Sequence, residues 1–196
     1  MIDENFLMDK GATLRKYKKD QCIFYEGDKG MYYFQIIEGS IKMVSVNDTG
    51  KEFIQGIFKN GESFGEPVLL IDEPYPASAV ANEDSIILKL DKQLFLNILK
   101  ENPGIHFLFS QVLAKRIYHK ALMAKEILTN GPENRVFSIL KMFKKDNHLN
   151  GKHYKVELSR QQIADMTGLR VETVIRSVKK LQEKKLIKIE KGKIYM

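Results

Sequence analysis

The chain has 196 residues, of which 43% are hydrophobic and 29% are charged, as in an ordinary globular protein. It contains no apolar run of the roughly 20 residues that a membrane-spanning helix requires, and residues 1–10 lack the pattern of a signal peptide. The missing apolar run leads us to expect no membrane partner. The single cysteine, Cys22, excludes an internal disulfide and a four-cysteine metal site, so we expect a cytoplasmic protein.

The positive charge is concentrated in the last third of the chain. Residues 132–196 contain 16 lysines and arginines against seven aspartates and glutamates, whereas residues 1–131 contain 16 against 18. A basic module joined to a nearly neutral one is typical of a protein that binds a polyanion. A solvated basic surface has the same composition, so the charge indicates the class of partner and leaves the function to the motifs.

Residues 21–90 have the pattern of many short strands. Runs rich in Ile, Val, Phe and Tyr alternate with turn signals such as Asp48-Thr49-Gly50-Lys51. We expect strands at residues 22–25, 31–38, 40–47, 52–58, 62–65 and 85–90. Since no helical segment separates these runs, the pattern predicts a β-roll or jelly-roll barrel and not a parallel sheet.

The hydrophobic period then changes to that of helices. Asp91 caps an expected short helix that ends near Lys100, and residues 102–104 break the pattern. A long helix is expected over residues 105–130, with an apolar stripe that either packs on the barrel or on a second copy of the helix. The stripe comprises Phe109, Val112, Leu113, Ile117, Ala121, Ala124 and Leu128. Its two alanines allow close helix approach, so we expect a homodimer.

The remaining segments complete an α+β chain of three parts. Gly131-Pro132 is interpreted as a hinge, residues 134–144 as an amphipathic helix and residues 146–153 as a polar loop. We therefore expect a sensor domain at residues 1–102, a dimerisation helix with its hinge at residues 103–131, and a winged helix-turn-helix at residues 132–196.

The helix-turn-helix is predicted from local signals. Ser159 with Gln162 three residues later forms a capping box, so the first helix begins near Arg160. Thr167-Gly168 breaks that helix, and a second one follows over residues 171–181. Two short helices joined by a tight, glycine-containing turn are typical of a DNA-binding helix-turn-helix.

The second helix separates an apolar side from a charged side, at about 100° per residue. The apolar side comprises Val174, Val178 and Leu181. The opposite side carries Glu172, Arg176 and Lys179. Arginine bonds two acceptors of guanine and glutamate accepts from the cytosine amino group, so the charged side suits the major groove of double-stranded DNA.

Further residues are expected to contact phosphates. Around the two helices these are Arg160, Gln161, Arg170 and Thr173. Residues 183–195 have the pattern of strand, turn and strand, which predicts a wing with Lys191 and Lys193 at its tip. The alternatives are an ordinary helical hairpin with a charged surface and a ligand-binding regulatory module without direct DNA readout. The regulatory module leaves the basic excess of residues 132–196 unexplained.

Three motifs resemble those of one family. The first comprises Glu26-Gly27-Asp28 with residues 33–42 (YFQIIEGSIK), and the second comprises residues 61–66 (GESFGE). The third comprises residues 159–187. In this order, they resemble the barrel, turn and helix-turn-helix signatures of the CRP/FNR superfamily of bacterial transcription factors. The resemblance covers essentially the whole chain. It implies a homodimer that binds an inverted-repeat operator, changes shape with a signal and has RNA polymerase as a partner.

The resemblance also assigns roles in the second helix. Glu172 and Arg176 fall on the family's two principal base-reading positions. Val171-Glu172-Thr173 is similar to the arrangement of the fumarate–nitrate branch, which implies TTGA-like half-sites. Ile175 departs from the small side chain usual before the arginine, so the resemblance does not define the outer base pairs.

The sensor half departs further from the family pattern. In its cyclic-nucleotide binders a Gly-Glu pair holds the ribose, and an arginine about ten residues later neutralises the phosphate. Here residues 67–81 contain no arginine or lysine, and Tyr75-Pro76 occupies the Arg-Ser positions. Burying a phosphate without a cation is costly, so we expect neither cyclic AMP nor a cofactor. The candidate pocket for an unidentified effector comprises Gly65, Glu66, Tyr75, Pro76 and Ser78.

We do not expect an enzyme. Residues 1–105 contain no histidine, which excludes a cupin-type metal site, and Cys22 has no local partner with which to form a Cys-His hydrolase site. The four histidines all follow the predicted barrel and Cys22 stands alone, so neither haem, an iron–sulfur cluster nor another metal is expected.

Overall fold

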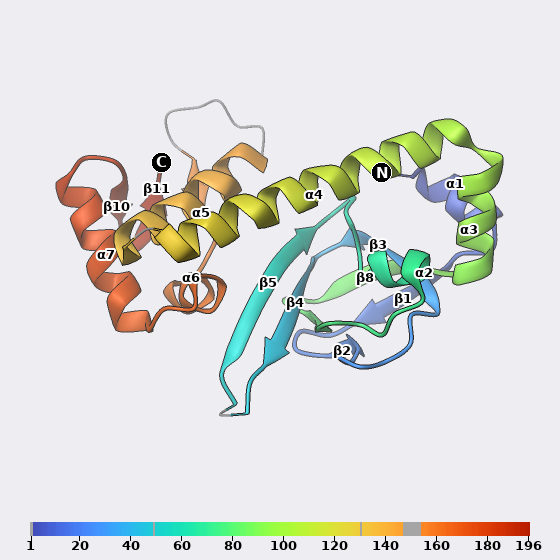
Figure 1. The fold of residues 1–196 in the computed structure, drawn as a ribbon, viewed down its shortest axis with the longest axis horizontal. Helices are drawn as coiled ribbons and strands as arrows, with labels where there is room; N and C mark the ends of the chain where they lie inside the picture. The colour runs from blue at the N-terminus through green and yellow to red at the C-terminus, as the bar shows by residue number, and fades with distance from the viewer. Residues whose placement is uncertain (1, 49, 130, 147–153) are drawn as a thin grey trace. The chain divides into compact units, whose positions relative to one another are not determined.

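The computed structural model describes residues 2–48, 50–129, 131–146 and 154–196. The chain divides into two compact units, residues 1–114 and residues 115–196 (Figure 1). Each unit is considered by itself below. Among the described residues, no helix is both long enough and apolar enough to cross a membrane.

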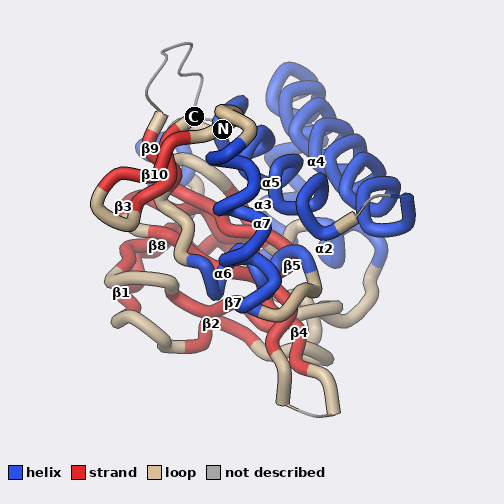
Figure 2. The backbone as a smooth tube through the Cα atoms, turned by 90° about the vertical axis from the view of Figure 1, so that its left-hand side faces the viewer, coloured by secondary structure: helices blue, strands red, loops and turns tan. Residues whose placement is uncertain are grey.

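The first unit is a β-roll made of two antiparallel sheets (Figure 2). Within the described residues, the strand orders are β1-β8-β3-β6 and β2-β7-β4-β5. The strands are β1 (Thr13–Tyr17), β2 (Cys22–Phe24), β3 (Tyr32–Glu38), β4 (Ser40–Val46), β5 (Glu52–Lys59), β6 (Ser63–Phe64), β7 (Ser78–Ala81) and β8 (Ser85–Asp91). Each strand run predicted from the sequence is confirmed within a few residues, and β1 and β7 were missed.

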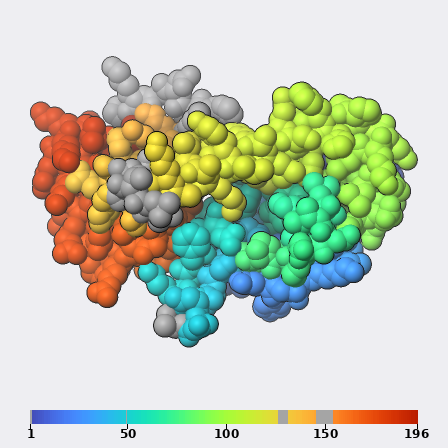
Figure 3. Space-filling view, in the orientation of Figure 1, coloured from blue at the N-terminus to red at the C-terminus, as the bar shows by residue number. Residues whose placement is uncertain are grey.

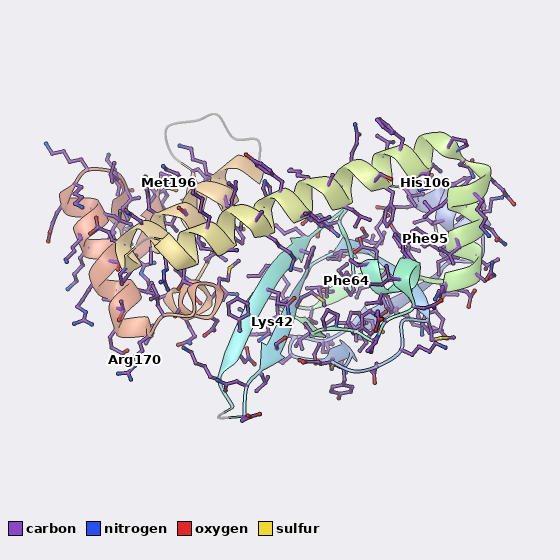
Figure 4. All side chains as sticks on the ribbon, viewed as in Figure 1. Lys42, Phe64, Phe95, His106, Arg170 and Met196 are labelled. Carbon is purple, nitrogen blue, oxygen red and sulfur yellow. The ribbon has the colours of Figure 1, made fainter. Side chains whose placement is uncertain are left out.

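The main core of the roll lies between the two sheets. Phe34 and Ile36 of one sheet and Ile41 of the other are buried in the same apolar cluster, together with Phe24 and Phe64. Figure 4 shows Phe64 among the strands. This cluster explains why the strand runs are rich in β-branched and aromatic residues, which pack well on a pleated surface.

A second core lies on the outer side of the β1-β8-β3-β6 sheet. Tyr33 projects there from β3 and stacks on Phe95 of helix α3 (Lys92–Glu101), with ring centroids 4.3 Å apart. Helix α1 (Glu4–Asp9) contributes the buried Leu7. Because the middle of β3 is buried on both faces, its apolar residues do not alternate with exposed polar ones, and the polar Gln35 among them is buried.

The local helix signals in the first unit are borne out at Asp91. Its carboxylate accepts hydrogen bonds from the backbone N–H groups of Gln93 (2.7 Å) and Leu94 (3.4 Å), as expected for an N-cap. The short helix α2 (Pro67–Ile71), like α1, was not predicted from the sequence.

The long helix α4 (Pro103–Thr129) begins earlier than predicted. It begins at Pro103 instead of Ile105, because proline is well suited to the first position of a helix. The predicted stripe divides into a part that faces the roll and an exposed part with Ile117, Ala121 and Ala124. Phe109 is only 6% exposed and packs in the second core with Leu113, so this part of the predicted stripe faces the roll.

Another side of α4 is apolar and exposed. Its exposed large apolar residues are Phe107, Leu108, Ile117, Tyr118 and Leu122. At about 100° per residue, Phe107, Tyr118 and Leu122 fall within about 60° of each other and on the side opposite Phe109. Figure 3 shows part of α4, in green to yellow, on the visible face. Leu128 of the predicted stripe lies outside the described side chains.

The second unit contains helices and a small antiparallel sheet (Figure 1). Beyond the end of α4, its elements are α5 (Pro132–Asp146), β9 (Lys155–Val156), α6 (Arg160–Thr167), α7 (Val171–Glu183), β10 (Lys188–Glu190) and β11 (Lys193–Tyr195). Within the described residues the sheet order is β10-β11-β9. The predicted wing strands are confirmed, β9 was missed, and most of the predicted loop at 146–153 lies outside the described residues.

Candidate DNA-binding site

The helix-turn-helix is built by the capping signals that the sequence contains. Ser159 Oγ accepts a hydrogen bond from the Gln162 N–H (3.0 Å), and Gln162 Oε1 accepts one from the Ser159 N–H (2.9 Å). At the other end of α6, Gly168 has φ of +69°, a left-handed conformation that favours glycine. The capping box and the break are therefore confirmed, and α7 begins at Val171 as predicted.

Helix α7 presents one buried and one exposed side. Val174, Val178 and Leu181 are buried and anchor the helix in the core of the second unit. Glu172, Arg176 and Lys179 are exposed. Within the described residues, no ion pair occupies Arg176 or Lys179. The charged side predicted from the sequence is therefore open to a ligand.

The residues at the start of α7 differ in exposure. Arg170 is the N-cap residue and is exposed (Figure 4), and its carbonyl oxygen accepts the N–H of Thr173 at 3.0 Å. Val171 and Thr173 are half-buried. The first turn of α7 thus carries Arg170 and Glu172 outward while Thr173 lies closer to the protein.

Arg160 lies against the wing. Its Nη2 donates to the carbonyl oxygen of Gly192 at 3.4 Å, and burial lowers the pKa of this guanidinium. Gln161 is exposed, and its Nε2 donates to Asp165 Oδ1 at 2.8 Å. The structure therefore brings the start of α6 next to the turn of the wing, two regions that are about thirty residues apart in the chain.

The wing tip carries two exposed lysines. Lys191 and Gly192 form the turn between β10 and β11, with φ of +46° and +76°. Lys193 is the first residue of β11 and pairs with Glu190 across the hairpin. Both lysines are exposed on the β10–β11 hairpin, which suits a contact with a phosphate backbone.

A groove beside α7 adds residues that the sequence analysis missed. It has a volume of about 520 Å³. It is lined by residues 131–134 at the start of α5 and by Thr173, Arg176, Ser177, Lys180 and Lys184. Lys184 forms an ion pair with Glu133 at its edge. Lys180 lies within about 40° of Arg176 around the helix axis, so the helical periodicity that identified Arg176 could also have identified Lys180. Nothing local indicated Asn134, because α5 meets α7 only in the folded chain.

The predicted effector residues are partly brought together in the β-roll. Gly65, Glu66 and Tyr75 are neighbours: a Cβ on Gly65 would lie 3.1 Å from the Tyr75 ring and 2.9 Å from the Phe24 ring. Glu66 is buried and accepts a hydrogen bond from Ser63 Oγ. Burial, with the charges of Glu66 and Asp28, raises the pKa of Tyr75.

The other two predicted effector residues are engaged by the roll itself. The carbonyl oxygen of Pro76 accepts hydrogen bonds from Ser45 Oγ (3.2 Å) and Gln55 Nε2 (3.4 Å). Ser78 Oγ accepts the N–H of Glu26 at 2.9 Å. These groups tie the neighbouring strands and turns together.

A β-roll followed by a winged helix-turn-helix is the architecture of a DNA-binding transcription regulator. The chain matches the cyclic nucleotide-binding domain family over residues 14–102 and the Crp-like helix-turn-helix domain family over residues 134–196. It belongs to the CRP/FNR family of transcription regulators.

Relatives and solved structures agree with this assignment. The chain is 26% identical to the cyclic AMP receptor protein of Thermus thermophilus over 181 residues, covering 92% of this chain and 82% of the relative. It is 27% identical to the global nitrogen regulator of a Nostoc species over 189 residues, covering 93% and 84%. The c-di-GMP responsive global regulator CLP of Xanthomonas campestris has the same fold, with a TM-score of 0.79, 19% identity and coverage of 98% and 99%.

Proposed function

We propose that the chain binds, as a homodimer, an inverted-repeat operator with TTGA-like half-sites. The observation that carries this proposal is the exposed side of α7, where Glu172 and Arg176 stand one helical turn apart. A recognition helix that carries such a pair reads base edges in the major groove.

The two side chains have separate roles in this proposal. Arg176 donates two hydrogen bonds to O6 and N7 of a guanine, and Glu172 accepts from the amino group of a cytosine. In a TTGA half-site the guanine lies on one strand, and its partner cytosine lies on the other. The adjacent Val171 and Lys179 border this contact.

The surrounding residues set the register of the protein on the duplex. Arg160, Gln161, Arg170, Thr173, Lys191 and Lys193 would contact phosphates. They come from the starts of α6 and α7 and from the wing. Phosphate contacts orient a protein and supply affinity without reading sequence.

The dimer is proposed on the exposed apolar side of α4. Phe107, Tyr118 and Leu122 are exposed in the single chain. A second copy of α4 would cover them, and a two-fold symmetric dimer matches an inverted-repeat site.

The signal at the β-roll is proposed to differ from cyclic AMP. The names of the relatives indicate different signals, namely cyclic AMP for one and c-di-GMP for another. Family membership therefore does not assign the effector. At the position where cyclic-nucleotide binders of the family have the arginine that neutralises the phosphate, this chain has Tyr75, which is 3% exposed. We propose that an effector other than cyclic AMP acts at the residues Gly65, Glu66, Tyr75, Pro76 and Ser78. We also propose that the protein needs no cofactor and that RNA polymerase is a partner.

A binding selection on random duplexes tests the proposed readout. Wild-type protein should enrich a two-fold symmetric motif with TTGA-like half-sites about one helical turn apart, centre to centre. Arg176→Ala should lose discrimination at the guanine and retain the remaining base preferences. If wild type and variant enrich the same motif equally, α7 is not the reader. If wild type enriches no sequence, the protein is a regulatory module without direct DNA readout.

A further inference from the structure

Ile175 is a large apolar side chain on the charged side of α7. It is 41% exposed, although its neighbours Val174, Val178 and Leu181 supply the buried face of the helix. Among the described residues 131–196, the other exposed large apolar side chain is Leu186, which lies after the end of α7. The exposure of Ile175 is thus a local feature of the recognition helix.

The position of Ile175 places it within the proposed reading surface. At about 100° per residue, Ile175 is about 60° from Glu172 and about 40° from Lys179 around the helix axis. Both of these side chains are exposed. If α7 presents Glu172 and Arg176 to base edges in the major groove of DNA, it therefore presents Ile175 to the major groove as well.

Ile175 does little for the stability of the helix. β-branched residues have a lower helix propensity than alanine, and a side chain that remains in water gains little from apolar burial. Its branched apolar surface is covered only if a ligand covers it. In the major groove the apolar group on a base edge is the C5-methyl group of thymine.

We propose that Ile175 is a specificity-determining residue that contacts the C5-methyl group of one thymine in each half-site. This inference rests on the proposed function and adds an apolar contact to the polar readout by Glu172 and Arg176. Removing one buried methyl contact lowers affinity by about fourfold, or about 15-fold when both half-sites lose it.

Replacing thymine by deoxyuridine isolates this contact, because uracil lacks only the methyl group and keeps the same base-pairing groups. The selected operator is synthesised as a series of duplexes, each with one thymine position replaced symmetrically in both half-sites. Dissociation constants are measured by fluorescence anisotropy for wild type, Ile175→Ala and Leu186→Ala. The last variant removes an equally exposed aliphatic side chain outside the helix.

The proposal expects one position at which deoxyuridine weakens wild-type binding by about 15-fold. At that position Ile175→Ala should bind thymine and uracil duplexes equally, whereas Leu186→Ala should behave as wild type. Equal wild-type affinity for every duplex, equal sensitivity of Ile175→Ala and wild type, or a selected half-site without thymine would overturn the inference. In the first two cases the selected motif still supports the proposed function, whereas a half-site without thymine also contradicts the TTGA-like half-sites of that proposal. If no motif is selected, both proposals fail.

Discussion

The ring of Tyr75 stacks on the ring of Phe24, with centroids 3.6 Å apart and 12° between the ring planes. Phe24 in turn contacts Phe34 and Phe64, with centroids 5.7 Å and 6.1 Å away. Gly65 packs against the Phe24 and Tyr75 rings. The part of the roll that contains the Gly-Glu pair is therefore filled by the aromatic side chains of the protein.

Cyclic AMP should bind weakly or not at all for this reason. Cyclic AMP would have to displace the Tyr75 ring, and residues 67–81 offer no cation to its phosphate. Isothermal titration calorimetry of the purified protein with cyclic AMP should give no saturable heat at micromolar concentrations. A micromolar dissociation constant would show that a cation from elsewhere neutralises the phosphate.

Phe24→Ala should destabilise the roll by about 3–5 kcal/mol, because it leaves a cavity where several rings meet. Phe24 is buried, whereas its neighbour Tyr25 is exposed, so Tyr25→Ala is a matched control with an expected change below about 0.5 kcal/mol. Urea unfolding followed by circular dichroism measures both. If both variants lost a similar free energy of unfolding, the burial of Phe24 in the aromatic cluster would contribute little to the stability of the roll.

The apolar side of α4 predicts a dimer that one pair of substitutions disrupts. Wild type should sediment at about 45 kDa, twice the 22.7 kDa of the chain. Tyr118→Glu combined with Leu122→Glu places charges on the exposed apolar side and should give a monomer.

Ile71→Glu provides the control for the dimer, because Ile71 is also exposed but lies on α2. It should leave the sedimentation unchanged. A monomeric wild type at micromolar concentration, or a dimeric double variant, would place the interface elsewhere.

Elements with strong local signals were predictable from the sequence. Ser159 and Gln162 define the start of α6 because both partners of the capping box lie within one turn. Asp91 does the same for α3. The period of Val174 and Val178 gives the buried face of α7, since a helix repeats its faces regardless of what covers them.

Features that depend on distant contacts were not predictable in this way. Periodicity showed that α4 is apolar, but it did not show that Phe109 and Leu113 pack on the roll while Tyr118 stays exposed. The burial of Tyr75 depends on its stacking with Phe24, which comes from another part of the chain. Strand β1 was missed because its residues are mostly exposed at the edge of a sheet, so burial imposes no strong alternation.

The salt dependence of DNA binding should separate phosphate contacts from base contacts. Lys191 is exposed at the turn of the wing, where an ammonium group can neutralise a phosphate. Lys191→Ala should weaken binding to operator and random duplexes by the same factor. The slope of log affinity against log salt should become shallower by about one counterion per protomer.

Arg176→Ala should behave differently in the same titrations, because its guanidinium is proposed to bond a base. It should cost roughly 1–3 kcal/mol of binding free energy on the operator and much less on random duplexes.

Lys100→Ala, which removes an exposed lysine from the last turn of α3 in the roll, is the charge-matched control and should change neither affinity nor slope. If Lys191→Ala alters sequence preference while Arg176→Ala weakens all duplexes alike, the roles assigned to the wing and to α7 are reversed. Fluorescence anisotropy at several salt concentrations distinguishes these results, because a lost phosphate contact changes the slope for every duplex and a lost base contact changes the ratio between duplexes.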